Sequence, residues 1–549
     1  MDAHLRTAIR VTALVLAPIV WAGCGGDCDH RTATPGVTAT ATAVATSTAV
    51  PSNTAAPTST GTATSPPAPT GTATPADTPT ASPTPTEAVP NPLLEGPITG
   101  GRGSPWLQST NFDLAEIGYM QTELFMSGTA RAYTNVGELP PDGAWLAMPA
   151  GTTAAYRTRI VVYRPIDAED FNGTVLVEWF NVSGGLDAAP DWTSLHTELT
   201  REGYAWVGVS VQRVGIEGGG GPFNLSLKAV DAARYGSLHH PGDSFSYDIF
   251  SQAGQAVRAP GDGLDPLSGL RPERVIAVGE SQSAFRLVTY INAIHPLVRL
   301  YDGFLVHSRG GGGAALSQAP QADVPVPSPA LIRTDLQEPV LTFETETDLI
   351  TLGYLPARQP DGPSFRLWEV AGTAHADTYT LVVGFGDRGD TPAGAVVFEV
   401  SNPIPGFIEC DRPVNSGPQH FVLKASMAAL DRWVRTGEAP PIAPRLELAG
   451  DPPAFVLDEH GNVRGGIRTP YVDVPIAILS GLGQTGGNFC LIFGTTDLFD
   501  AAKLDSLYAD HAAYVDAVSD ATDSAVDAGF ILPADAELIK QAAEEAEIP

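Results

Sequence analysis

Short apolar runs alternate with amphipathic stretches along the chain after about residue 92. Runs rich in β-branched and aromatic residues predict strands at 158–165, 174–181, 204–212, 274–280, 302–308, 339–345 and 364–372. Apolar residues at helical spacing predict helices at 191–203, 247–259 and 283–295. Strands joined by helices form parallel sheets with helices on both faces, so we expect an α/β fold with a mostly parallel central sheet. In such sheets the active groups gather at the carboxyl ends of the strands.

The first residues carry the pattern of an export signal. Two arginines precede an apolar stretch over 11–20, which is too short for a usual membrane span and is typical of a signal peptide. The tripeptide that closes it, AGC, resembles a bacterial lipoprotein box. We therefore expect a lipoprotein-type signal over 1–23, with the lipid on Cys24. An ordinary secretory signal with a free Cys24 is the alternative, because Trp21 stands where leucine is usual.

Residues 24–92 are dominated by threonine, alanine, proline and serine, as in TATATAVATSTAVPS. This composition offers no apolar period to bury, and its prolines favour extended conformers, so it predicts a disordered tether. With a lipid at one end and a folded body at the other, the protein is expected at the cell envelope or outside the cell. Its only expected contact with the membrane is the N-terminal lipid anchor.

The rest of the chain, 93–549, contains enough apolar residues for one large domain. The glycine- and proline-rich segment 308–338 is a candidate lid over the site, and a flexible surface loop is the alternative. The last segment, 501–549, has the pattern of one or two amphipathic helices packed on the body.

The charge balance excludes some functions. The net charge is −31, from 62 acidic and 31 basic residues. Nucleic acid is not an expected partner, because contacts to phosphate are made by lysine and arginine, and polyanionic substrates are disfavoured. The chain contains no C-x-x-C, H-E-x-x-H or G-x-x-x-x-G-K-[ST] motif, so we expect neither a metal nor an organic cofactor.

The stretch VIAVGESQSAF, from residue 275, predicts a buried strand, a tight turn and then a helix. This is the pattern of a nucleophile elbow, which holds a serine hydroxyl at the tip of a strained corner. Gly279 provides one of the small residues that such a corner requires, while Ser283 stands where the usual motif has a second glycine. A serine that merely caps a helix is the plain alternative. The elbow interpretation makes Ser281 the candidate nucleophile.

A serine nucleophile requires a histidine to take its proton and a carboxylate to orient that histidine. In chains with this elbow the order is serine, acid, histidine. Asp348 follows the strand 339–345 and is the candidate acid, with Glu346 as the competing one. His375 closely follows the next strand and a glycine, which makes it the candidate base.

Attack on an ester creates an oxyanion that must be met by backbone N–H groups. The amide of Gln282, directly after the nucleophile, is the first expected donor. The second is expected from the loop after the strand 174–181, at Asn181 or Val182. The alternative is that the glycines of this loop serve only its turn.

Other histidines and aromatic residues have weaker candidate roles. His239, His240 and His307 are candidate pocket residues, although structural hydrogen bonds are the commoner use of such side chains. His420 and His460 lie among polar residues and are interpreted as surface groups. The aromatic residues near the expected pocket favour a partly apolar substrate, unless they belong to the core; they are Trp179, Phe180 and Phe285.

Export makes a disulfide possible, and Cys410 with Cys490 is the candidate pair within the folded body. Two buried thiols are the alternative, and Cys28 at the start of the tether is expected to be free.

Five strings together resemble a bacterial family of largely uncharacterised proteins defined by an alpha/beta hydrolase domain. They are GESQSAFRLVTYINAIHP, YDGFLVHSRGG, YGSLHHPGDSFSYDIFSQA, VEWFNVSGG and GGIRTPYVDVPIAILSG. The resemblance covers nearly everything after about residue 95. It implies the alpha/beta hydrolase fold and a serine triad on Ser281, His375 and Asp348, but no particular substrate.

These observations predict an exported serine hydrolase that cleaves a carboxylic ester through an acyl-enzyme. The substrate would be a small-molecule or oligomeric ester. Two alternatives remain: an amidase or peptidase with the same triad, and a binding protein with the hydrolase fold but no catalysis.

Overall fold

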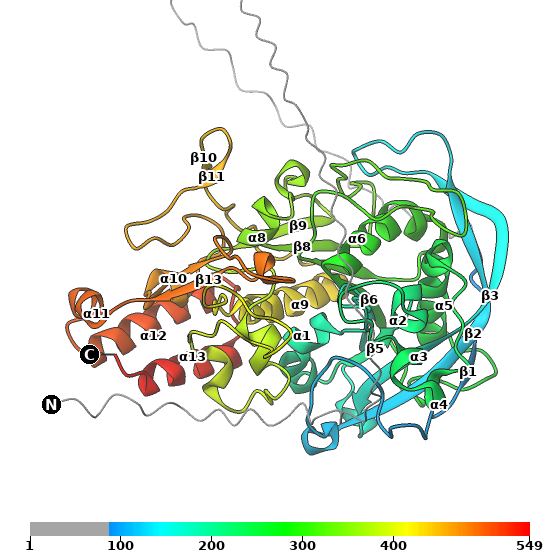
Figure 1. The fold of residues 1–549 in the computed structure, drawn as a ribbon, viewed down its shortest axis with the longest axis horizontal. Coiled ribbons are helices and arrows are strands. Elements are labelled where there is room, and N and C mark those ends of the chain that lie inside the picture. Colours follow the sequence, from blue (N-terminus) through cyan, green and yellow to red (C-terminus); the bar gives the residue numbers. More distant parts are fainter. Residues whose placement is uncertain (1–86, 549) are drawn as a thin grey trace, which may run out of the picture. The chain divides into compact units, whose positions relative to one another are not determined.

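A nine-stranded sheet forms the centre of the computed structural model, which describes residues 87–548 (Figure 1). Its strand order is β1-β2-β3-β5-β4-β6-β7-β8-β9. The strands are β1 (Leu93–Glu95), β2 (Tyr119–Asn135), β3 (Ala147–Pro165), β4 (Thr174–Trp179), β5 (Ala205–Val209), β6 (Arg274–Glu280), β7 (Gly303–His307), β8 (Val340–Thr345) and β9 (Phe365–Val370). From β5 to β9 every neighbouring pair is parallel, whereas β1, β2 and β3 pair antiparallel at one edge. The expected α/β class with a mostly parallel sheet is confirmed.

Helices cover both faces of this sheet. They are α1 (Pro190–Arg201), α2 (Arg213–Glu217), α3 (Leu227–Val230), α4 (Ala232–Tyr235), α5 (Ser246–Arg258), α6 (Gln282–Thr289), α7 (His295–Val298), α8 (Glu346–Ile350) and α9 (Gln419–Thr436). The apolar side chains of α5 and α6 share one core cluster with alternate residues of β4 and β6. The apolar side chains of α1 and α9 share the other cluster with the intervening residues of the same strands. Strands β4 and β6 are therefore buried on both faces, which explains their continuous apolar sequences.

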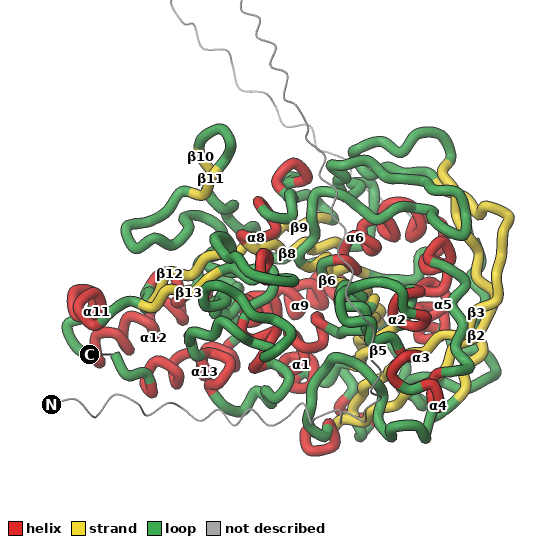
Figure 2. Tube along the Cα trace, in the orientation of Figure 1, coloured by secondary structure: helices red, strands yellow, loops and turns green. Residues whose placement is uncertain are grey.

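The C-terminal part adds smaller elements beside the main sheet. They are β10 (Leu448–Ala449), β11 (Ala454–Phe455), α10 (Pro470–Asp473), β12 (Ala477–Ser480), β13 (Thr495–Leu498), α11 (Ala501–Leu507), α12 (His511–Asp527) and α13 (Pro533–Glu545). The last three helices lie together near β12 and β13 (Figure 2). Their apolar faces form a separate cluster with Phe421 of α9, so these helices pack on the domain. Among the described residues, no helix combines the length and apolar character needed to cross a bilayer.

Two elements differ from what the sequence pattern predicts. The strand expected at 158–165 is the end of the much longer β3, whose partner β2 is absent from the prediction (Figure 1). β2 mixes polar and apolar residues without a regular period, and its extended form follows from its long antiparallel pairing with β3. Helix α9 is also absent from the prediction, and it places His420 in the interior rather than on the surface.

Some of the segments expected from the sequence lie outside the described residues, and others lie within them. The signal peptide, Cys24, Cys28 and nearly all of the tether lie outside the described residues. The segment 308–338 contains no helix or strand, and its buried residues include Leu316 and Ile332 in the main core cluster. It is thus anchored to the body, and a lid function for it stays a prediction. The sulfurs of Cys410 and Cys490 are joined in a disulfide.

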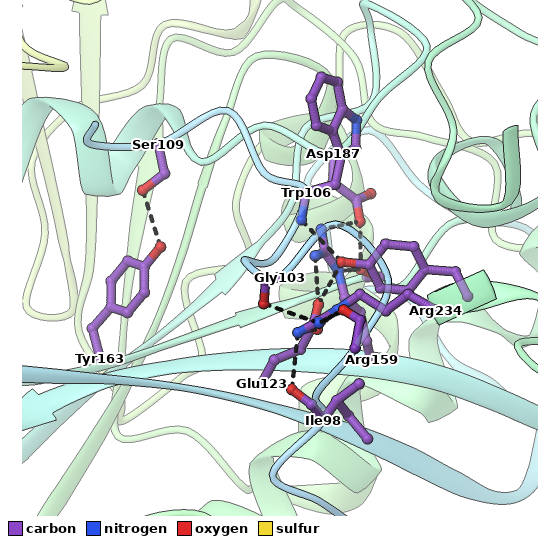
Figure 3. Close-up of polar contacts among 12 residues, drawn as sticks. Ile98, Gly103, Trp106, Ser109, Glu123, Arg159, Tyr163, Asp187 and Arg234 are labelled. Carbon is purple, nitrogen blue, oxygen red and sulfur yellow. Dashed lines mark hydrogen bonds and ion pairs between the residues drawn. The ribbon is translucent and has the colours of Figure 1, made fainter. Parts of the chain in front are cut away.

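A buried ionic cluster fastens the antiparallel edge of the sheet to the loop that follows β4 (Figure 3). The guanidinium of Arg159, on β3, donates to Glu123 of β2 and to Asp187 of the loop, in each case at 2.9 Å. The side chains of all three residues are at most 1% exposed. Arg234 also donates to Glu123, and Ser210 donates to Asp187. Because every charge has a partner, the cluster avoids the large cost of an isolated buried ion.

Replacing Arg159 by methionine is expected to destabilise the domain strongly. The substitution leaves Asp187 without its cation and Glu123 with only Arg234, and breaking a buried pair in this way costs about 3–5 kcal/mol. Urea unfolding followed by circular dichroism measures the change.

The matched control is Arg157→Met on the same strand. Arg157 pairs with Glu95, and their side chains are 30% and 44% exposed, so its loss should cost at most about 1 kcal/mol. Equal losses of unfolding free energy in the two variants would contradict the role given to the buried cluster.

Candidate active site

Ser281 lies at a sharp corner between β6 and α6, as the sequence pattern predicts. Its backbone has φ +56° and ψ −119°, a conformation that costs free energy for a residue with a side chain. Two hydrogen bonds hold the corner: the Ser281 N–H donates to the His307 carbonyl at 2.9 Å, and the Phe285 N–H donates to the Ser281 carbonyl at 3.1 Å. The serine side chain is partly exposed at the carboxyl end of the sheet.

The small residues around the corner have a steric reason. A Cβ added to Gly279 would lie 3.3 Å from backbone atoms of Ser283, a tight approach that would require this backbone to shift. Ser283 stands at the position of the usual second glycine, and its hydroxyl donates to the Glu280 carbonyl at 2.6 Å. The departure from the glycine pattern therefore adds a hydrogen bond within the turn.

The structure brings Ser281, His375 and Asp348 into one chain of hydrogen bonds. The Nε2 atom of His375 is 2.8 Å from Ser281 Oγ, and its Nδ1 atom is 2.7 Å from Asp348 Oδ1. The imidazole is almost completely buried. Burial opposes its positive charge, but the nearby carboxylates of Asp348 and Glu280 outweigh that effect and raise the pKa of His375. This arrangement can remove the serine proton and stabilise the resulting imidazolium.

The two candidate acids have different positions. Asp348 lies in the first turn of α8, where its Oδ2 accepts from the N–H and the hydroxyl of Thr345, both at 2.7 Å. This capping box leaves Oδ1 free to meet His375. Glu346 accepts instead from the N–H groups of Gly372 and Gly481, at 2.6 and 2.8 Å. Burial raises the pKa of Glu346 to about 7.

Glu346 thus contacts the loop that leads to His375 rather than the imidazole itself. Gly372 begins that loop with φ +74°, in the left-handed region that favours glycine. Its N–H is one of the two that Glu346 accepts from. The carboxylate therefore fixes the start of the turn that carries His375 to the serine.

The structure also distinguishes the candidate oxyanion donors, by whether each N–H already has an acceptor. The N–H of Asn181 is already bonded to the Ala188 carbonyl at 3.0 Å, so it is not available for an oxyanion. The N–H groups of Gln282 and Val182 have no acceptor within residues 87–548. The side chain of Asn181 donates to the Glu280 carbonyl at 3.2 Å, which ties this loop to the elbow. Val182 and Gln282 are the two amides that the structure leaves available.

Glu280, directly before Ser281, is a residue of the candidate site that the sequence pattern did not single out. Its Oε1 is 3.2 Å from His375 Nε2, and its Oε2 accepts from the Asn181 side chain at 3.0 Å. Burial raises the pKa of Glu280 to about 7. The sequence signal for it was its position in GES, at the end of a strand and directly before Ser281.

The other histidines have structural contacts. His307 Nδ1 is 2.9 Å from Asp191 Oδ1, and its carbonyl accepts from Ser281, so it lies beneath the elbow. His240 is buried against the Val211 carbonyl, whereas the side chain of His239 is 64% exposed. His460 is half-buried.

The interpretation of His420 as a surface group is wrong. Its ring stacks on Tyr379 with centroids 3.5 Å apart, and burial lowers its pKa well below the usual value. His420 is buried because it lies on the inward face of helix α9.

The aromatic residues expected near the pocket belong mainly to the core. Trp179 packs against Phe250 on one side of the sheet, and Phe180 packs against Trp206 on the other. Both are fully buried, whereas Phe285 is half-buried in the first turns of α6. Trp179 and Phe180 therefore provide no argument about the substrate.

Among residues 87–548, no group of three or more histidine, cysteine, aspartate or glutamate side chains is arranged to hold a metal ion. Three buried acids at this end of the sheet have other partners: Asp348 contacts a histidine, Glu346 accepts from backbone amides, and Glu369 accepts from an arginine.

Comparison with known proteins gives one family match. The model of the family described as "Alpha/beta hydrolase domain" matches residues 94–541. No curated protein is significantly similar to the chain in sequence.

The solved structures that match parts of this chain include the following three hydrolases. A serine hydrolase without a lid from Xanthomonas campestris is 13% identical, with 40% of this chain and 80% of that chain covered and a TM-score of 0.24. A glucuronoyl esterase from Solibacter usitatus is 10% identical, with coverages of 46% and 76% and a TM-score of 0.24. Acetyl xylan esterase 1 from Thermoanaerobacterium is 13% identical, with coverages of 40% and 53% and a TM-score of 0.20.

The family match spans the sheet, the elbow and the C-terminal helices, and its description agrees with the architecture found here. The chain therefore belongs to the alpha/beta hydrolase domain family.

Proposed function

We propose that this protein is a serine hydrolase that cleaves carboxylic esters through an acyl-enzyme on Ser281. The observation that carries the proposal is the continuous chain of hydrogen bonds from Asp348 through His375 to Ser281 Oγ. Each member follows a different strand, and further hydrogen bonds fix Ser281 through its backbone and Asp348 through Thr345. Such preorganisation is what nucleophilic catalysis by a serine requires.

The first half-reaction transfers the acyl group to the enzyme. Ser281 Oγ attacks the ester carbonyl carbon while its proton passes to His375 Nε2. The N–H groups of Gln282 and Val182 donate to the oxyanion that forms, an effect of about 3 kcal/mol per donor. When the tetrahedral intermediate collapses, the imidazolium of His375 gives its proton to the leaving alcohol oxygen.

The second half-reaction releases the acid. A water molecule attacks the acyl carbonyl and gives a proton to His375 Nε2, and the second tetrahedral intermediate collapses as that proton returns to Ser281 Oγ. Asp348 holds the proton on Nδ1 throughout, so that Nε2 remains the nitrogen that exchanges protons.

We also propose that the enzyme works outside the cytoplasm, attached by a lipid on Cys24. The sequence of the first 23 residues supports this, and the disulfide between Cys410 and Cys490 is of a kind that persists in oxidising compartments. Mass spectrometry of the membrane fraction from cells that make the full chain would detect a lipidated cysteine as the first residue.

Removing the nucleophile or the base is expected to abolish turnover. Ser281→Ala and His375→Ala should each lower kcat for p-nitrophenyl acetate roughly 10⁴-fold or more, because neither proton transfer nor acylation can then occur. A fluorophosphonate probe should label the native protein at Ser281, as identified by peptide mass spectrometry.

The matched control is Ser283→Ala, which removes a neighbouring hydroxyl that bonds only within the turn. It should retain probe labelling at Ser281. Absence of labelling in the folded native protein would favour a binding protein, and hydrolysis of anilides faster than esters would favour an amidase.

Replacing the two acids separately tests which one serves His375. Asp348→Asn should lower kcat roughly 10³–10⁴-fold, because the imidazole loses its orienting carboxylate. Glu346→Gln should have a smaller effect on kcat and a larger one on thermal stability, because it disturbs two backbone hydrogen bonds. A larger fall of kcat in Glu346→Gln than in Asp348→Asn would contradict the assignment.

A further inference from the structure

Glu280 presents a second carboxylate to the nitrogen that exchanges protons with Ser281. Its Oε1 is 3.2 Å from His375 Nε2, while Ser281 Oγ lies 2.8 Å from the same atom. The other oxygen, Oε2, accepts from the side chain of Asn181 at 3.0 Å. The side chain of Glu280 is only 9% exposed, so water does little to screen its charge.

The surroundings of Glu280 contain two histidine–aspartate pairs. The first pair is His375, which contacts Glu280 through Nε2, and Asp348 of α8, which contacts Nδ1 of the same imidazole. On the neighbouring strand β7, His307 stands directly opposite Glu280 in the register and contacts Asp191 at the start of α1. Both imidazoles lower the pKa of Glu280, while burial and both aspartates raise it.

Asp191 in turn lies beside another buried acid. Its N–H donates to Glu178 of β4 at 3.1 Å. Burial and the charge of Asp191 raise the pKa of Glu178 well above its usual value. Burial opposes the positive charge of His307, but its hydrogen bond to Asp191 and the charges of the surrounding carboxylates together raise its pKa. The groups facing Glu280 from the neighbouring elements are therefore His375, His307, Asp348 and Asp191.

The position of Oε1 has a specific electrostatic effect on His375. A neutral imidazole that can accept the serine proton presents a lone pair at Nε2. An ionised carboxylate makes no favourable electrostatic interaction with that lone pair. Once Nε2 carries a proton, the same carboxylate lies beside a positive charge and a donor. An ionised Glu280 therefore favours the imidazolium over the neutral ring.

We infer that Glu280 is a positioning residue that stabilises the protonated imidazole of His375 in the reaction and thereby sets the acidic limit of activity. The inference rests on the proposed serine mechanism. During acylation the proton leaves Ser281 Oγ for Nε2, and Glu280 helps hold it there until the leaving alcohol takes it. In the free enzyme the same contact retains a proton on His375 at pH values where an isolated triad would have lost it.

The test compares pH profiles of kcat/KM for the native enzyme and Glu280→Gln with p-nitrophenyl acetate. Glutamine keeps the size of the side chain and its contact with Asn181 but removes the charge. The midpoint of the acidic limb should fall by about one pH unit, because the imidazole loses one neighbouring carboxylate. The plateau at higher pH should fall about tenfold, because the transition-state imidazolium is less stabilised.

Two further variants control the measurement. Glu346→Gln removes another buried carboxylate at the same end of the sheet, bonded to Gly372 and Gly481 rather than to an imidazole, and it should retain the native midpoint. Glu280→Asp keeps the charge but withdraws it from Nε2, so its midpoint should lie between those of the native enzyme and Glu280→Gln. If Glu280→Gln does not fold, Glu280→Asp still tests the inference by the shift of its midpoint relative to the native enzyme.

The outcomes separate this inference from the proposed function. A fall in plateau activity with an unchanged or higher midpoint in both Glu280 variants would overturn it and leave a purely structural role. The pH dependence of fluorophosphonate labelling provides a second measure, since labelling needs the same neutral imidazole. If Ser281 is labelled but the midpoints do not move, only the role of Glu280 fails; if Ser281 is never labelled in folded protein, the serine mechanism fails as well.

Discussion

The strained backbone of Ser281 is the constraint on which the site depends. The combination of φ +56° and ψ −119° costs free energy for a residue with a side chain, so it persists only because the surrounding structure holds it. Here β6 is fixed in the centre of the sheet, α6 packs its apolar face into the core, and the turn between them is closed by bonds to His307 and within the helix. The packing free energy of two large elements thus holds one hydroxyl at a corner where an imidazole can reach it.

The carboxylates around this corner show how neighbouring acids acquire different tasks. Asp348 has one oxygen fixed by Thr345 and presents the other to the imidazole. Glu346 is two residues away, yet it bonds to backbone amides of two other loops. Glu280 meets the opposite nitrogen of the same imidazole. The direction in which each side chain leaves its element, rather than its chemistry, separates these contacts.

The antiparallel edge contributes to the site from a distance. Arg159 joins β3 to the loop after β4 through Asp187, and the same loop carries Val182 and the Asn181 side chain that bonds to Glu280. A buried cation with several partners costs desolvation but allows few alternative geometries, which suits a loop whose amides must point in fixed directions. The position of this loop therefore depends on strands that lie outside the parallel sheet.

The sequence alone was sufficient for the parallel strands and for the sharp turn at Ser281, because continuous apolar runs and small residues two positions before and after a serine are local patterns. It also placed the candidate base His375 shortly after a strand end, and the role of that histidine stays a proposal. It could not determine β2, whose extended form depends on pairing with β3, or the burial of His420, which depends on how α9 lies on the sheet. Nor could it separate Asn181 from Val182, or show that Glu280 reaches His375. Those outcomes depend on side-chain direction and on contacts between residues nearly a hundred positions apart, such as Asn181 and Glu280, which only the packed tertiary structure fixes.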